Sequence, residues 1–344
     1  MNTTLTALKG VKVGHSTDLE KLTGCTVVVF DNPYPVAYKA TGGTPRVYDS
    51  KILDEGKSFF RKHAIYISDG AHAGLETAAF ISKALRKKKI GYQIGKNLIP
   101  SITGACVQSL GLYINEFNPE CGYEAVQDSS NTQVKAGNVG AGTGTSVGKF
   151  SWTESGLCLA MKTGVGSARI DLGHGLIVSA LTVVNALGNI IDMQGGILAG
   201  NRHDNEEFRF RTFEGFADFL LENSSNTTIS IVGTNAKLKN QEDLRKIAEI
   251  ATHGQIRAIN PLNTSLDGDT VFVFSTEEQD LHLSSIGKTI AKGDWYKIGI
   301  DILAQTAAKA VQESIYDACY QAETIKFESA YKGIIPSVKD CTKS

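Results

Sequence analysis

Short apolar runs along the chain predict strands, and apolar residues spaced three and four apart predict helices. Residues 23–32 (TGCTVVVFDN) and 63–70 (HAIYISDG) are short apolar runs typical of buried strands. The second run continues into residues 71–89, which end in a basic cluster that suits a helix C-terminus. The apolar stripe of this predicted helix consists of Leu75, Ala79, Ile81, Ala84 and Leu85.

The second half of the chain again alternates predicted helices and strands. Residues 240–259 predict a helix with Asn240 as its N-cap and acidic residues in its first turn. Residues 269–276 (DTVFVFST) predict a strand, and the Ala-rich residues 298–322 predict a long, largely buried helix. The apolar face of the first of these helices consists of Leu244, Ile247, Ala248 and Ala251. Strands with helices at both ends predict a layered α/β fold.

Residues 175–191 (GLIVSALTVVNALGNII) carry no charge and raise the question of a membrane span. Asn185, Gly188 and Asn189 argue against a span, and we expect two buried strands joined by a tight turn. The chain has no repeat and no glycine-rich linker, which favours a single domain over residues 1–344.

The composition limits the partners of this protein. Of 344 residues, 42% are hydrophobic, and 35 Lys and Arg balance 36 Asp and Glu. No whole face is then charged enough to attract nucleic acid or an anionic membrane, so we expect neither as a partner. The N-terminus has no export or organelle pattern, which predicts a cytoplasmic protein. The six cysteines form no CxxC pair and the histidines no ligand spacing, so we expect reduced thiols and no metal.

The glycine-rich segment 136–150 (AGNVGAGTGTSVGKF) fails the tests for a nucleotide loop. Thr143 stands where a phosphate loop needs glycine, and Phe150 stands where it needs Ser or Thr. The dinucleotide fingerprint fails too, at its last glycine, so we expect no cofactor. Two interpretations stay open: a run of tight turns, or a backbone lining a pocket with Lys149 as a fixed cation or proton donor.

Asp267 and Asp269 match the D-x-D-x-V pattern of magnesium-dependent phosphatases that form an aspartyl phosphate. In that mechanism an apolar strand precedes the first Asp, whereas here the strand follows. A turn with Gly268 at its bend is the plainer alternative, although it leaves the two acids unexplained. Asn185 is a second polar signal, because a buried amide needs a partner and can also donate to an oxyanion.

Residues 223–235 (NSSNTTISIVGTN) pass from polar residues directly into a strand pattern. This is either an ordinary loop or a strand whose first residue becomes a chain end. As an N-terminus, Thr227 has a hydroxyl nucleophile and an α-amine with an ordinary pKa of about 7.7 to 8.0, suited to a base. Attack of its hydroxyl on the Asn226 carbonyl, an N-to-O acyl shift and ester hydrolysis would release it.

Nine segments, in order, resemble the L-aminopeptidase/D-esterase (DmpA-like) family, which includes β-aminopeptidases and nylon-oligomer hydrolases. These segments are GVKVGHSTD, TGCTVVVF, TGGTPR, DGAHAGLETA, GNVGAGTGTSVGK, VVNALGNIID, NTTISIVGTNAKL, IATHGQIRAINPLNT and DGDTVFVFST. The resemblance implies an αββα sandwich of the N-terminal-nucleophile hydrolase type, autoprocessed into two chains. The cut would fall between Asn226 and Thr227 and give an α-chain of residues 1–226 and a β-chain of residues 227–344.

At matching positions the resemblance implies Thr227 as nucleophile, with Asp267 and Asp269 orienting its amine and hydroxyl, and Lys149 and Asn185 completing the site. It implies an enzyme acting on short peptides, amino-acid amides or 6-aminohexanoate oligomers, and a symmetric assembly of α/β pairs such as a tetramer.

Three positions depart from the family pattern. Gln108 stands where the family usually has an aromatic substrate contact, and Asp69 and His72 replace a usual Gly and Phe, which predicts a more polar pocket. Two alternatives to this function stay open: a magnesium-dependent phosphatase that uses Asp267 and Asp269, and an inactive binding homologue.

Overall fold

A computed structural model describes residues 2–58, 60–113, 115–149, 159–203, 206–210, 226–281, 295–327 and 333–341 of the chain. Within these residues, nine strands form a continuous mixed sheet that folds over at one long strand, β2 (Thr23–Ala40). The register between β2 and β4 shifts between Val29 and Tyr34, where the strand passes from one half of the sheet to the other. A β-bulge of this kind bends a strand and increases its twist.

The first half of the sheet contains the N-terminal part of β2 and four other strands. Its order is β1-β2-β4-β7-β3, and only β4 and β7 run parallel. The four are β1 (Val11–Asp18), β3 (Val47–Tyr48), β4 (Arg61–Ser68) and β7 (Ile102–Cys106).

The second half has the order β10-β11-β16-β18-β2, with β16 and β18 parallel. Its further strands are β10 (Val165–Asp171), β11 (Ile177–Asn185), β16 (Thr227–Lys237) and β18 (Thr270–Asp280). β16 therefore lies in the middle of this half, between an antiparallel and a parallel neighbour. Its first ten residues are all buried, and they include polar residues on both faces, such as Ser230 and Asn235.

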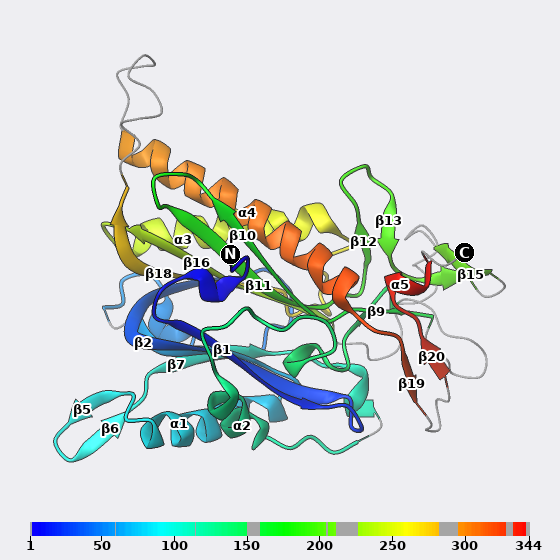
Figure 1. Ribbon diagram of the computed structural model, residues 1–344, viewed down its shortest axis with the longest axis horizontal. Helices are drawn as coiled ribbons and strands as arrows, with labels where there is room; N and C mark the ends of the chain where they lie inside the picture. Colours follow the sequence, from blue (N-terminus) through cyan, green and yellow to red (C-terminus); the bar gives the residue numbers. More distant parts are fainter. Residues whose placement is uncertain are drawn as a thin grey trace.

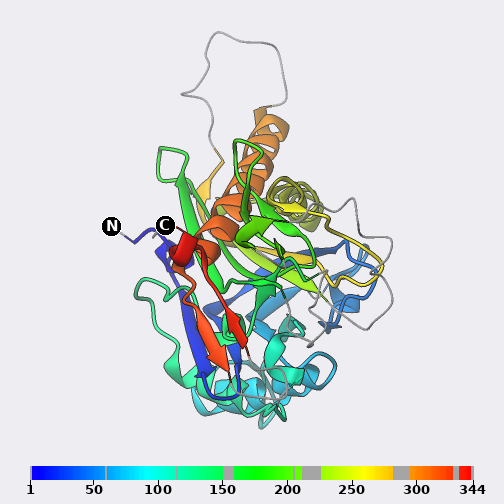
Figure 2. The same cartoon turned by 90° about the vertical axis from the view of Figure 1, so that its right-hand side faces the viewer.

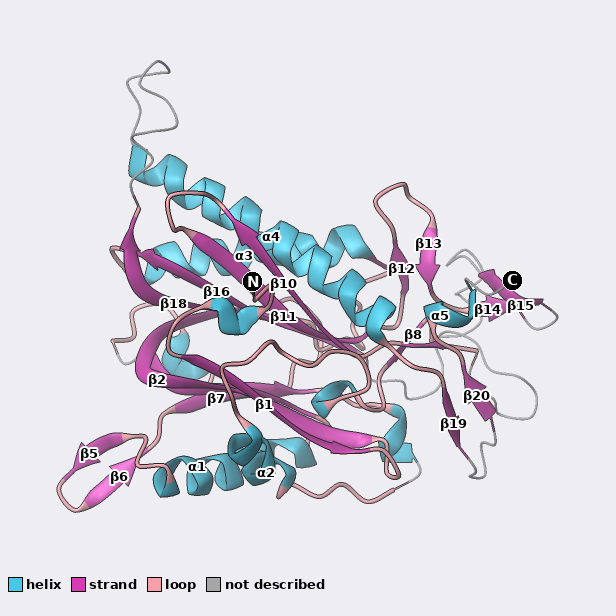
Figure 3. Ribbon diagram, in the orientation of Figure 1, coloured by secondary structure: helices cyan, strands magenta, loops and turns pink. Residues whose placement is uncertain are grey.

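Helices cover the outer faces of both halves of the sheet (Figures 1 and 3). α1 (Thr77–Lys87) and α2 (Cys121–Asp128) pack against the first half of the sheet. α3 (Gln241–Ala258) and α4 (Trp295–Gln321) cover the second half, and Figure 2 looks along α3 and shows it beside α4. The predicted αββα sandwich is confirmed.

Alternating side chains of the central strands fill two separate cores. Ile231 of β16 and Phe272 of β18 lie between the two halves of the sheet. Their neighbours Val232 and Val273 point the other way and pack under Ala251 of α3. The strand period of two thus buries both faces, one against the other half of the sheet and one against helices.

Small elements extend from this sandwich, and several gather at one end of the molecule, at the right of Figure 1. That group is β12 (Asn189–Ile191), β13 (Ile197–Ala199), β14 (Arg202–His203), β15 (Glu206–Phe210), β19 (Ile325–Phe327), β20 (Gly333–Ile335) and α5 (Val338–Cys341). The remaining elements are β5 (Tyr92–Ile94), β6 (Asn97–Ile99), β8 (Ser146–Val147), β9 (Met161–Lys162), β17 (Ile259–Asn260) and the 3-10 helices η1 (Leu5–Ala7), η2 (Lys51–Leu53), η3 (Ala73–Glu76), η4 (Leu110–Tyr113) and η5 (Gly140–Gly142).

The structure confirms most of the elements expected from the sequence and corrects one helix face. Asn240 caps α3, because its side chain accepts a hydrogen bond from the Asp243 amide at 2.9 Å. In α1 the inclusion of Ala79 in the buried stripe is wrong, since Ala79 is exposed and Ala78 is buried instead. The reason is the helical spacing itself, because Ala79 lies two residues before Ile81 and therefore about 200° around the helix from it.

Residues 175–191 form two strands, β11 and β12, as expected, but they belong to different sheets. Of the cysteines, Cys25, Cys106, Cys121 and Cys319 are buried free thiols, Cys158 lies outside the described residues, and nothing is described of the Cys341 side chain. No described helix has the length and apolar character needed to cross a membrane.

Candidate active site

Thr227 is the first residue of β16 and is 1% exposed. The antiparallel register with β11 sets Asn185 directly opposite Thr227. On the other side, an isolated parallel bridge joins Asn226 to Asp267, three residues before β18 begins. The end of β11, the start of β16 and the segment leading into β18 therefore meet where these neighbouring strands begin or end.

Hydrogen bonds hold the peptide group between Asn226 and Thr227 on both sides. The Asn226 amide donates to the Leu266 carbonyl at 3.4 Å, and the Asn226 carbonyl accepts from the Gly268 amide at 2.8 Å. The Thr227 hydroxyl also donates to the Asn226 carbonyl oxygen, at 2.5 Å. The hydroxyl thus lies beside the carbonyl that it would attack, and a backbone N–H polarises that carbonyl.

Backbone amides hold the two aspartates. Asp269 accepts from the Thr228 amide at 2.6 Å and from the Asn263 amide at 3.1 Å. Asp267 accepts from the Thr264 amide at 2.7 Å through Oδ2, while its buried Oδ1 has no hydrogen-bond partner among the described residues. An acceptor oxygen beside the start of β16 suits an ammonium group formed there by cleavage.

Burial dominates the electrostatics of this pair. It raises the pKa of Asp267, and burial together with the nearby Asp267 charge raises the pKa of Asp269 to about 8. The positive charge of Lys149 opposes both shifts. Before cleavage the pair therefore holds a proton at neutral pH, because two buried carboxylates do not ionise together easily.

Lys149 and Asn185 form the other side of the site. Lys149 Nζ donates to the Asn185 backbone carbonyl at 2.9 Å and to its Oδ1 at 2.8 Å. The Ser146 amide also donates to Oδ1 at 3.3 Å, and Asn185 Nδ2 donates to the Gln108 carbonyl at 2.8 Å. These contacts show which end of the Asn185 side-chain amide is the oxygen and which is the NH₂ group that donates hydrogen bonds. The glycine-rich segment thus holds Lys149 beside the end of β11.

Gln108 and His72, the two residues expected to contact the substrate, have different surroundings in the structure. Gln108 reaches the site through its backbone carbonyl, and its side-chain Nε2 donates to the Tyr113 hydroxyl at 3.1 Å. His72 is exposed and accepts a hydrogen bond from Arg46 Nε at 3.2 Å. Among the described residues, no hydrogen bond joins His72 to Thr227, so a direct substrate contact by His72 stays a prediction.

Sequence reasoning missed the backbone donors and supports of the site. Gly268, Thr264 and Ser146 contribute through main-chain N–H groups, which any residue type provides. Of these three residues only Gly268 carried a sequence signal, as a glycine between two acids. The structure gives the reason for glycine there, since a Cβ would stand 2.9 Å from the Thr227 hydroxyl oxygen.

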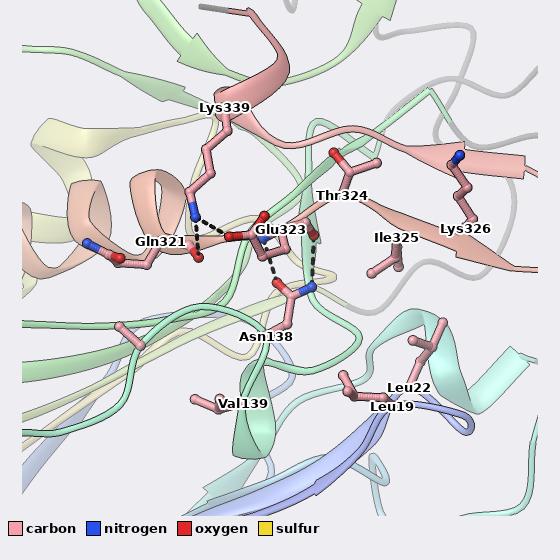
Figure 4. Close-up of a pocket in the computed structure, with 11 residues that line it drawn as sticks. Leu19, Leu22, Asn138, Val139, Gln321, Glu323, Thr324, Ile325, Lys326 and Lys339 are labelled. Carbon is pink, nitrogen blue, oxygen red and sulfur yellow. Dashed lines mark hydrogen bonds and ion pairs between the residues drawn. The ribbon is translucent and has the colours of Figure 1, made fainter.

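A surface pocket of about 600 Å³ lies elsewhere (Figure 4). Leu19, Leu22 and Ile325 form part of its apolar wall, and Asn138 bridges both backbone polar groups of Glu323 across it. None of its lining residues belongs to the Thr227 site, so we do not assign the chemistry to it.

Comparison with known proteins places this arrangement in a family. The model of peptidase family S58 matches residues 3–332. The chain belongs to peptidase family S58. It is therefore a hydrolase of amide bonds of the N-terminal-nucleophile type. This membership replaces the phosphatase interpretation of the acid pair.

Relatives within family S58 carry related names. A 6-aminohexanoate-oligomer endohydrolase of Kocuria sp. (strain KY2) is 32% identical over 280 residues, 79% of this chain and 74% of that protein. An uncharacterised aminopeptidase of Mycobacterium leprae (strain TN) is 29% identical over 295 residues, 79% of this chain and 78% of that protein.

A solved structure supports the fold assignment. The L-aminopeptidase D-Ala-esterase/amidase of Ochrobactrum anthropi, described as a variant of the Ntn hydrolase fold, superposes with a TM-score of 0.68 at 17% identity. The match covers 97% of this chain and 90% of that one. The family member described here thus has an Ntn-hydrolase-like fold.

Proposed function

We propose that this chain is an autoprocessing N-terminal-threonine amide hydrolase that cuts itself between Asn226 and Thr227. The single observation that carries the proposal is the Thr227 hydroxyl, 2.5 Å from the Asn226 carbonyl oxygen, which the Gly268 amide also binds. The products are an α-chain of residues 1–226 and a β-chain of residues 227–344, which remain packed in one sandwich.

Self-cleavage begins when Thr227 Oγ attacks the Asn226 carbonyl carbon. The Gly268 N–H stabilises the charge that develops on the carbonyl oxygen. The C–N bond then breaks, the hydroxyl proton ends on the freed amine, and an ester joins Asn226 to Thr227 Oγ. Water hydrolyses the ester and leaves Thr227 with both an α-amine and a free hydroxyl.

The new amine changes the electrostatics of the acid pair. Once protonated, it adds a positive charge at the start of β16 and favours the ionised form of carboxylates whose pKa values burial had raised. The pair in turn orients the amine next to the hydroxyl. Cleavage thus converts a protonated acid pair into the partner of a terminal amine.

Substrate hydrolysis repeats the chemistry on an external amide. Thr227 Oγ attacks the carbonyl carbon while its amine in the neutral form, or the Asp267/Asp269 pair, takes the proton, and Lys149 and Asn185 Nδ2 are the donors for the oxyanion. The leaving amine receives the proton, and water then releases the acid from the acyl-enzyme.

We place the substrates among linear amides of amino acids, namely short peptides, amino-acid amides and 6-aminohexanoate oligomers. Supporting this are the names of the two sequence relatives and the carboxylate pair, which can also bind a substrate ammonium. The α/β pairs are proposed to assemble as a symmetric tetramer.

The test compares wild type, Thr227→Ala and Thr228→Val on a denaturing gel and on a panel of amino-acid p-nitroanilides, β-peptides and 6-aminohexanoate oligomers. Thr228 is the matched control, because its buried hydroxyl has no hydrogen-bond partner among the described residues. We expect Thr227→Ala to lose both cleavage and activity and Thr228→Val to keep both. An active Thr227→Ala protein contradicts the proposal, and an uncut, inactive wild type supports the binding-homologue alternative.

A further inference from the structure

A buried carboxylate that the proposed mechanism does not use stands close to the site. Asp69 follows β4 and is fully buried. Its Oδ1 accepts from the amides of Gly70 at 2.9 Å and Ser109 at 3.0 Å, and its Oδ2 accepts from the Ser109 hydroxyl at 2.5 Å. Burying a carboxylate costs free energy unless such donors compensate it, so this position needs a reason.

Ser109 connects Asp69 to one end of the Asn185 amide. The residue before Ser109 is Gln108, whose carbonyl accepts the hydrogen bond from Asn185 Nδ2. Two bonds from Asp69 hold Ser109, one to its backbone and one to its side chain. The position of the Gln108 carbonyl therefore depends on Asp69.

Ser109 also supports the segment at the other end of that amide. Gly144 packs so closely that a Cβ there would stand 2.4 Å from Ser109 Oγ, and the Leu110 amide donates to the Gly144 carbonyl at 3.1 Å. From Gly144 the chain runs to Ser146 and Lys149, which both donate to Asn185 Oδ1.

We infer that Asp69 is a positioning residue for amide hydrolysis, because through Ser109 it holds both groups of contacts that orient the Asn185 amide opposite Thr227. The inference rests on the proposed function, in which Asn185 Nδ2 donates to the oxyanion.

The ionised form of Asp69 is the one that accepts all three hydrogen bonds. Burial raises the pKa of Asp69 to about 6, against the lowering effects of Ser109, Gly70 and Lys149. Of the titratable groups near Asp69, Lys149 carries the opposite charge, and burial raises the pKa of the Cys106 thiol, which stays neutral. Activity should therefore fall as the pH drops through about 6 and Asp69 takes up a proton.

The experiment measures kcat, KM and the extent of self-cleavage for wild type, Asp69→Ala, Asp69→Asn, Ser109→Ala and the Asp69→Ala/Ser109→Ala pair. We expect Asp69→Ala and Ser109→Ala each to lower kcat roughly 10- to 100-fold with KM nearly unchanged, because displacing a reacting group by about 1 Å costs rate on this scale. The double variant should be no slower than the slower single variant, since the two residues act as one unit.

Asp69→Asn keeps the shape of the side chain, so the inference does not depend on whether the alanine variant folds. Protonation of the Thr227 amine lowers kcat in both proteins as the pH falls, but Asp69→Asn should lack the additional decline that Asp69 causes in the wild type near pH 6. Asp317→Asn is the matched control, because Asp317 is another acid whose pKa burial raises, and it accepts the Ser167 amide at 2.9 Å away from the site. This control should keep the wild-type kcat and pH profile.

Two results overturn the inference alone: a wild-type kcat in Asp69→Ala beside an active wild type, or an Asp69→Asn profile that declines near pH 6 as steeply as the wild-type profile. An uncut, inactive wild type overturns the proposed function, and this inference with it.

Discussion

Gly268 lies where a single methyl group would press on the nucleophile. A Cβ at this position would stand 2.9 Å from Thr227 Oγ1 and 3.2 Å from the Thr44 carbonyl oxygen. An ordinary carbon–oxygen contact is about 3.4 Å, so Gly268→Ala would displace the hydroxyl by roughly 0.5 Å. The Thr44 carbonyl oxygen also limits the space available to the methyl group.

The displacement sets the size of the expected effect. If 1 Å of misplacement costs about 100-fold in rate, 0.5 Å corresponds to roughly tenfold. We therefore expect Gly268→Ala to slow self-cleavage about tenfold, while its free energy of unfolding changes by no more than about 1 kcal/mol. The Gly268 amide remains, so the variant tests the placement of the hydroxyl and not the loss of the carbonyl donor.

The assay follows the disappearance of the uncut chain on a denaturing gel after a short pulse of synthesis. Gly196→Ala is the control, because a Cβ there meets only the end of the Asp192 side chain, at 3.0 Å. Cleavage of Gly268→Ala at the wild-type rate, in a folded protein, would refute the assignment of Thr227 Oγ1 as the attacking atom.

Three further predictions concern charge and stability. In uncut Thr227→Ala, Asp269 should hold about one more proton in the folded chain than in the unfolded chain between pH 5 and 7, because its pKa is raised to about 8. Its contribution to the free energy of unfolding should then fall by about 3 kcal/mol over that range, so the difference in stability between this protein and its Asp269→Asn variant should change by that amount in urea titrations at the two pH values. Lys149→Met should lower kcat roughly 100- to 1,000-fold in steady-state assays, because one oxyanion donor is lost, and an unchanged kcat would remove Lys149 from the site. Asn240→Ala should cost about 1 kcal/mol in the same titrations through loss of the α3 cap, whereas Asn240→Ser should not.

Local patterns predicted the elements of this fold well. The change from polar to apolar residues at 227 marked the start of β16, and the N-cap at Asn240 marked the start of α3. The buried face of α1 was predicted correctly at Ile81, Ala84 and Leu85. Ala79 was assigned to it wrongly, because apolar character alone does not place a small residue on the buried face.

The candidate site could be predicted only as separate pieces. Asn185 and Thr227 each carried a chemical signal, but their pairing depends on β11 and β16 being neighbours in register. The link from Asp69 to Ser109 joins two loops far apart in the chain, and a side-chain hydrogen bond of this kind has no sequence spacing. Gln108 contributes its carbonyl, which every residue has, so its identity held no information about that contact.

The most direct measurement of the central claim is the intact mass of the purified, active protein, combined with chemical identification of its free N-terminal residues. We expect two polypeptides, one ending at Asn226 and one whose free amine belongs to Thr227. Active protein that consists of a single continuous chain, with the nitrogen of Thr227 still in a peptide bond, would contradict this account.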